Sequence, residues 1–115
     1  MIKTKSIYEP KSKDDGLRVL ITRYYPRGVK KEHFDEWKRE LAPSRELLKS
    51  YKIGEITWKQ FEREFLKQMN GQDSTKMIQR LSHIAKNNSV TLLCYEKKEN
   101  NCHRHLIHDL VLNQI

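Results

Sequence analysis

The sequence predicts a single α/β domain over residues 1–115, with a sheet of three or more strands covered by four or five helices. Two observations carry this prediction. Residues 17–25 and 90–96 are rich in the β-branched, aliphatic and aromatic side chains that strands favour. Between them, apolar residues recur every three or four positions, as in amphipathic helices. Strands connected through helices usually lie parallel in one sheet, so we expect these two strands to be parallel.

A third strand is expected at the N-terminus, because two strands alone do not make a stable sheet. The segment IKTKSIYEP is predicted to form an edge strand that stops at Pro10. A polar turn ending at Gly16 leads into LRVLITRYY, residues 17–25, which must end before Pro26 because proline cannot donate to a strand ladder. The run VTLLCYE, residues 90–96, is almost continuously apolar at its start, which is typical of a buried strand.

Residues 29–41, VKKEHFDEWKREL, allow two interpretations. Phe34, Trp37 and Leu41 share one face of a helix, since they are spaced by three and four positions. Trp37, Arg39 and Leu41 would equally share one face of a short strand. We favour the helix.

Capping residues mark the starts of further helices. Ser44 is a natural N-cap, and Thr57 precedes a glutamine by three residues, which is the spacing of a capping box. Asp73 or Ser74 can cap the helix that follows. A last helix is expected over about residues 102–113, where leucine, isoleucine and valine recur with helical spacing.

The charge balance favours an anionic partner. The chain carries 23 basic and 15 acidic residues, a formal net charge of +8, and its pI is about 9.6. A basic surface can also serve only to keep a small protein soluble, so both interpretations stay open. No apolar run approaches the roughly 18 residues of a membrane span, and MIKTKSIYEP lacks the apolar region of a secretion signal. We therefore expect a cytoplasmic protein without a membrane partner, and two reduced cysteines.

Ligands of open α/β sheets bind beyond the carboxyl ends of the strands, and two segments are expected to meet there. The first is TRYYPRG, in which Arg23 and Arg27 bracket two tyrosines and a proline. Cations interleaved with aromatic rings suit phosphate binding combined with base stacking. Arg18 is a further anion-binding candidate, and Tyr25 and Trp37 would support the site. Alternatively, the arginines pair with acidic residues while the aromatic rings pack in the core.

The second segment is CYEKKENNCHR, which enters the last helix. Cys102, His103 and Arg104 are expected at the helix N-terminus, where free N–H groups and the macrodipole favour anions and thiolates. Cys102, His103 and Glu96 are the candidates for nucleophilic or acid–base catalysis, and Arg104 for binding a phosphate. Cys94 is expected to be a packed core thiol. The alternative is a small buried Cys102 at a helix start, with Arg104 on the surface.

A metal site is less favoured. Two cysteines and three histidines lie between residues 94 and 108, but the short Cys-x₂-Cys and His-x₃-His pairs of structural zinc sites do not occur. No Cys-x-x-Cys is present either, so a redox disulfide between Cys94 and Cys102 is also less favoured. We predict neither a metal nor a cofactor, and the sequence assigns no oligomeric state.

These motifs resemble one family over nearly the whole chain. DDGLRVLITRYYPRG, EWKRELAPSRELLKSY and VTLLCYE are similar to the YeaO-like branch of domain of unknown function 488. The matching positions are Asp15, Gly16, Arg18, Leu20, Arg23, Tyr25, Pro26, Arg27, Gly28, Trp37, Ala42, Pro43, Ser44 and Val90 to Leu93. Tyr25 stands where much of that branch has tryptophan, and the tail CYEKKENNCHR resembles the wider family instead. The resemblance implies a common site of Arg18, Arg23, Arg27, Trp37 and Ser44, and it implies no activity because the family is uncharacterised.

The sequence thus predicts an arginine-lined anion or phosphate site at the carboxyl edge of the sheet. Its ligand would be an anionic, phosphate-bearing molecule, of which a nucleotide or a nucleic acid is one example, and an enzyme acting on such a substrate is one interpretation. The alternative is a non-catalytic, basic nucleic-acid-binding module, whose affinity would fall steeply with salt.

Overall fold

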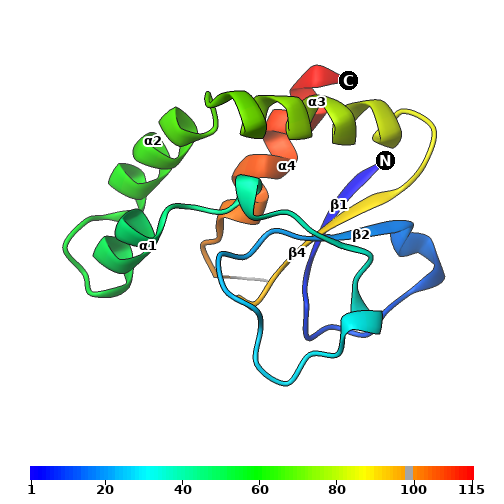
Figure 1. Ribbon diagram of the computed structural model, residues 1–115, viewed down its shortest axis with the longest axis horizontal. Coiled ribbons are helices and arrows are strands. Elements are labelled where there is room, and N and C mark those ends of the chain that lie inside the picture. The colour runs from blue at the N-terminus through cyan, green and yellow to red at the C-terminus, as the bar shows by residue number, and fades with distance from the viewer. Residues whose placement is uncertain (98–99) are drawn as a thin grey trace.

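The chain folds into a parallel four-stranded sheet with its helices packed on one face (Figure 1). The computed structural model describes residues 1–97 and 100–115. The order of the strands in the sheet is β1-β4-β2-β3, with β1 (Ile2–Ser6), β2 (Leu17–Leu20), β3 (Glu36–Trp37) and β4 (Val90–Cys94). The expected α/β class and the parallel pairing of the two strongest strands are confirmed.

The position of β4 between β1 and β2 explains its apolar sequence, since all five of its residues are buried. Ile2 and Leu17 both pair with Val90, and Ser6 pairs with Cys94. β1 lies at an edge of the sheet, as expected for the N-terminal strand. Cys94 is therefore the last residue of the central strand β4, at the carboxyl edge of the sheet, where the sequence predicts a site.

Residues 29–41 form no α-helix, so the interpretation that we favoured for this segment was wrong. Two single-turn 3-10 helices, Lys31–His33 and Arg39–Leu41, flank β3 instead. β3 pairs with β2, and the Trp37 indole N–H donates to the Thr22 carbonyl over 2.8 Å. The short-strand alternative is therefore correct around Trp37, because pairing with a distant strand outweighs the local helical spacing.

The described residues form four α-helices, α1 (Arg45–Lys52), α2 (Trp58–Gln68), α3 (Gln72–Ala85) and α4 (His103–Gln114). Ser44 caps α1 and Thr57 caps α2 through a capping box, as predicted. α3 begins earlier than predicted. Its N-cap is Gly71, while Asp73 and Ser74 lie inside the helix. The Ser74 hydroxyl donates to the Glu40 carbonyl, in the 3-10 turn that follows β3. None of the helices in the described ranges is long and apolar enough to cross a membrane.

The two faces of the sheet are covered differently. The larger core lies between the sheet and the helices and includes Val19, Leu92, Phe61, Phe65 and Ile107. On the other face, connecting segments cover a smaller cluster of Ile7, Leu20 and Leu93 (Figure 1). The helices therefore shield the sheet on one side, and loops must satisfy the polar groups on the other.

A buried ion pair stands on the loop-covered face. The Arg18 guanidinium is fully buried, and it donates to the Asp15 carboxylate and, over 2.9 Å, to the His33 carbonyl. Asp15 also accepts from Lys5 at 3.0 Å. Burial alone would raise the pKa of Asp15, but hydrogen bonds from the Ser12 N–H and Lys5, together with the Arg18 charge, hold that pKa below its ordinary value. This pair fastens the turn before β2 to the sheet.

Gly16 closes that turn, and we expect its replacement by alanine to be strongly destabilising. Its φ is +63°, and a Cβ there would overlap the Ser89 carbonyl, which already accepts from the Leu17 N–H. Gly16→Ala should lower the free energy of unfolding by about 2–4 kcal/mol in urea denaturation. The matched control is Gly54→Ala, where φ is +81° but no atom lies within 4 Å. The control should lose about 1 kcal/mol, the cost of the positive φ alone. Equal losses for the two variants would contradict a close approach at Gly16.

Candidate functional site

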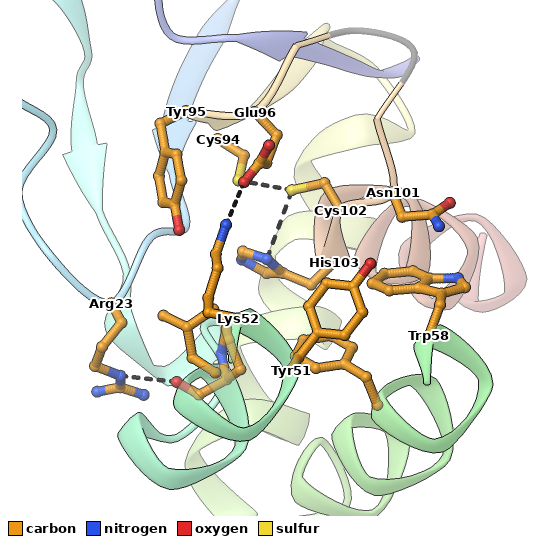
Figure 2. Close-up of a pocket in the computed structure, with 13 residues that line it drawn as sticks. Arg23, Tyr51, Lys52, Trp58, Cys94, Tyr95, Glu96, Asn101, Cys102 and His103 are labelled. Atoms are coloured by element: carbon orange, nitrogen blue, oxygen red, sulfur yellow. Dashed lines mark hydrogen bonds and ion pairs between the residues drawn. The ribbon is translucent and has the colours of Figure 1, made fainter. Parts of the chain in front are cut away.

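β4 and α4 bring the two cysteines together at the carboxyl end of the sheet (Figure 2). Cys94 is the last residue of β4, and Cys102 is the N-cap of α4. Their sulfur atoms lie 2.6 Å apart, and both residues are free thiols with exposed fractions of 1% and 3%. This separation is about 0.5 Å longer than an S–S bond. The end of β4 and the start of α4 thus place two cysteines that are eight residues apart in the sequence in direct contact.

His103 is oriented by a backbone carbonyl beside the thiols. Its Nε2 lies 2.5 Å from the Ile21 oxygen. Since a carbonyl can only accept, Nε2 carries a proton and donates it. Nδ1 then faces the Cys102 sulfur at 3.6 Å and can accept a proton from that thiol (Figure 2). The Phe65 ring packs edge to face against the His103 imidazole, with 5.4 Å between ring centres.

The two thiols differ in acidity. The Cys102 thiol donates to the Cys94 sulfur, and this hydrogen bond is the main reason why the pKa of Cys94 is well below its ordinary value despite burial. Burial raises the pKa of Cys102, and its hydrogen bond to Cys94 raises it further. Cys94 is therefore the thiol of the pair that ionises more readily, and Cys102 is the one that keeps its proton and donates it.

A small pocket opens beside the thiols (Figure 2). Tyr51, Trp58 and Phe61 line it and pack against one another, and Asn101 also lines it. The cavity has a volume of about 20 Å³, which is enough for one water-sized group. A water-sized group, such as one end of a larger molecule, can therefore lie beside the cysteines.

Lys52 and Glu96 form an ion pair at the rim of this pocket. Lys52 Nζ lies 2.6 Å from Glu96 Oε1 and 5.2 Å from the centre of the Tyr95 ring. Burial alone would raise the pKa of Glu96, but the Lys52 ammonium and the amide of Asn100 lower it below its ordinary value. Glu96, a catalytic candidate in the sequence, is therefore an ionised partner of Lys52 and a weak base.

Two of the arginines expected to bind an anion are bonded to backbone carbonyls near the pocket. Arg104 is buried, and its guanidinium donates to the carbonyls of Glu96 over 3.2 Å and Lys97 over 2.8 Å. It fastens the connection between the cysteines. Arg23 lines the pocket, and its Nε donates to the Pro43 carbonyl over 2.9 Å. Both guanidinium groups position loops at the site.

The remaining predicted residues lie farther from the thiols. Arg18 is in the ion pair on the opposite face of the sheet, and Arg27 is exposed. Tyr25 meets the Trp37 ring edge to face, with 5.6 Å between centres, beside the loop-covered cluster. Ser44 caps α1. The structure thus brings Arg23, both cysteines, His103 and Glu96 into one pocket, and it separates Arg18 from them.

Within residues 1–97 and 100–115, Cys94, Cys102 and His103 form the group that could hold a metal ion, since their ligand atoms lie within 4.8 Å of one another. A histidine whose other nitrogen is bonded to a carbonyl suits this role. However, two sulfur atoms on one tetrahedral zinc lie about 3.8 Å apart, so these thiols would have to separate by about 1 Å. The observed spacing fits the formation of an S–S bond better.

Sequence reasoning missed the contribution of α1 and α2. Lys52 and Tyr51 end α1, and Trp58 begins α2, far from the cysteines along the chain. Nothing near these residues in the sequence marks them, because their partners lie some forty residues away, as in the Lys52–Glu96 pair. The spacing of the aromatic residues in α2 indicated only that these rings pack in a core.

The fold and this site define a small α/β protein with a buried pair of thiols next to an oriented histidine. The chain belongs to the DUF488-N3a family, described as the active DUF488-N3 subclade, whose model matches residues 2–115. It is 33% identical over 110 residues to the uncharacterized protein YeaO of Escherichia coli, and the match covers 94% of each chain. It is 24% identical over 105 residues to the uncharacterized protein Rv3073c of Mycobacterium tuberculosis, a match that covers 79% of this chain and 89% of that protein. No solved structure matches significantly. The family resemblance found in the sequence is confirmed.

Proposed function

We propose that this protein is a thiol-dependent redox enzyme in which Cys94 and Cys102 alternate between a dithiol and a disulfide. The 2.6 Å separation of the two sulfur atoms carries this proposal. The low pKa of Cys94 and the small adjacent cavity support it, because they suit attack on a small oxidant. Membership of a subclade described as active also favours an enzyme over a binding module.

The reaction that fits this geometry is the reduction of a hydroperoxide. The Cys94 thiolate attacks one peroxide oxygen, the O–O bond breaks, and the leaving oxygen takes up a proton to become an alcohol or water. Cys94 is then a sulfenic acid. Cys102 gives its proton to His103 Nδ1 and attacks the Cys94 sulfur, so an S–S bond forms and hydroxide leaves, protonated to water. Two thiols have then supplied two electrons, and two external thiols, or one external dithiol, restore them by exchange and leave as a disulfide.

Intact-mass analysis after treatment with hydrogen peroxide tests the proposal. The reduced protein should consume one equivalent of peroxide and lose the mass of two hydrogen atoms, with the new bond mapped between Cys94 and Cys102. In Cys102→Ser, Cys94 should gain one oxygen atom, because no thiol is left to resolve the sulfenic acid. Cys94→Ser should do neither. A wild-type protein that stays fully reduced in excess peroxide would overturn the proposal.

A second candidate keeps the phosphate-bearing or nucleic-acid substrate that the sequence suggests. It is favoured by the net charge of +8 and by Lys52, which stands between the thiol pocket and a basic groove. If this candidate is correct, Cys94→Ser should abolish turnover of a phosphate ester, and peroxide should form no disulfide in the wild-type protein.

A further inference from the structure

A wider groove runs along α1 next to the thiol pocket and shares Leu48, Lys52 and Tyr95 with it. Its other lining residues are Tyr24, Arg45, Glu46 and Lys49. The groove has a volume of about 480 Å³, compared with about 20 Å³ in the thiol pocket. This size is typical of a ligand site, so the groove can hold a molecule that the thiol pocket cannot.

Three cations of α1 stand along this groove. Arg45, Lys49 and Lys52 are separated by four and three residues, so they share one face of the helix. All three are exposed, and Lys52 alone of them has an ion-pair partner among the described residues. From Arg45 to Lys52 the helix rises about 10 Å. That length matches about three nucleotides at the 3.4 Å rise of a stacked strand.

Aromatic rings lie at both ends of this row of cations. Tyr24 is 52% exposed, and the Arg45 guanidinium lies 6.0 Å from the centre of its ring. At the other end of the groove, Lys52 lies over Tyr95. Proteins that bind single strands combine a positively charged groove for the backbone with aromatic faces on which bases stack. A groove that served only solubility has no need of an exposed ring beside its cations.

We propose that this groove binds a single-stranded nucleic acid, with phosphates along Arg45, Lys49 and Lys52 and one base stacked on Tyr24. The site differs from the arginine cluster expected from the sequence, because three of those four guanidinium groups donate to acceptors within the protein. The site also goes beyond the redox chemistry of the thiols, since Arg45, Lys49 and Tyr24 line this groove and do not line the thiol pocket.

Fluorescence anisotropy with a labelled single strand of about ten nucleotides tests this site. The double variant Arg45→Ala/Lys49→Ala should lower affinity at least tenfold. It should also flatten the slope of log K against log salt by about 1.4, which is 0.7 for each of two lost phosphate contacts. Tyr24→Ala should lower affinity about tenfold, as expected for the loss of one stacked base. Lys59→Ala/Arg63→Ala is the matched control, since it removes two exposed cations from α2, outside the groove, and it should bind as the wild type does.

Three results would overturn the proposal. Equal weakening in both double variants would show attraction to net charge alone. Equal affinity for a duplex of the same sequence would exclude base stacking. Failure of Tyr24→Ala to change affinity, in a variant with unchanged circular dichroism, would exclude the ring. Cys94→Ser should bind the strand normally, so failure of the redox chemistry and failure of this site are separate outcomes.

Discussion

Replacing Cys102 by alanine is expected to raise the pKa of Cys94 and to slow alkylation of that thiol at neutral pH tenfold or more. The hydrogen bond from Cys102 is the main cause of the low pKa of Cys94. Without it, burial favours the neutral thiol. Because only the thiolate reacts, each unit by which the pKa rises above the working pH lowers the rate tenfold. Alkylation by iodoacetamide, followed by mass spectrometry across a range of pH, measures the change.

The direction of the pH dependence distinguishes the loss of the hydrogen bond from Cys102 to Cys94 from a simple loss of packing. In the wild type, alkylation of Cys94 should rise to a plateau below the ordinary thiol pKa of about 8.5. In Cys102→Ala the same rise should come above that value. Cys102→Ser is the matched control, because its hydroxyl still donates to the Cys94 sulfur and should keep much of the reactivity. Identical profiles for wild type and Cys102→Ala would contradict the assignment of Cys102 as donor.

Arg18→Met is expected to lower the free energy of unfolding by about 3–5 kcal/mol, because it leaves one member of a buried ion pair without its main partner. Asp15 and the His33 carbonyl both lose a donor, and Asp15 keeps Lys5, whose side chain is 20% exposed. Urea denaturation at neutral pH measures the loss. Lys5→Met is the control, and it should lose much less because that pair is open to solvent on one side.

This loss should depend on pH. The pKa of Asp15 is lowered in the folded protein, so the ion pair stabilises the fold fully above the unfolded carboxyl pKa of about 3.9. That stability is lost as the pH falls from there through the lowered pKa. The difference between wild type and Arg18→Met should therefore shrink in acid. A loss below about 1 kcal/mol at neutral pH, or one that is independent of pH, would contradict the role of this pair.

Local signals in the sequence predicted most of the fold. Ser44 and Thr57 cap the helices that they were expected to cap, because N-cap hydrogen bonds involve residues only two or three positions apart. The buried run that ends at Cys94 is a central strand, as its apolar sequence indicated. Trp37 was placed in a helix, since its spacing fits both a helix and a strand, and the choice depends on pairing with β2, well separated along the chain.

The site was predicted less completely. The carboxyl edge of the sheet and the placement of Cys102 and His103 at the last helix follow from parallel topology. Which of the two thiols has the lower pKa does not follow from the topology, because it depends on the 2.6 Å contact and on the proton that Cys102 donates. The low pKa consequently lies on Cys94, which the sequence suggested as a packed core thiol. The acceptors of Arg23, such as the Pro43 carbonyl, are likewise contacts between distant segments.

Cys94 and Cys102 are proposed to form a reversible bond with each other. Equilibration of the protein in a series of glutathione buffers, followed by acid quenching and mass mapping, tests it most directly. We expect one transition between the dithiol and the Cys94–Cys102 disulfide, with the two-electron slope of about 30 mV per tenfold change in the ratio of the two forms. Accumulation of mixed disulfides with glutathione, or two thiols still reduced in the most oxidising buffer, would contradict it.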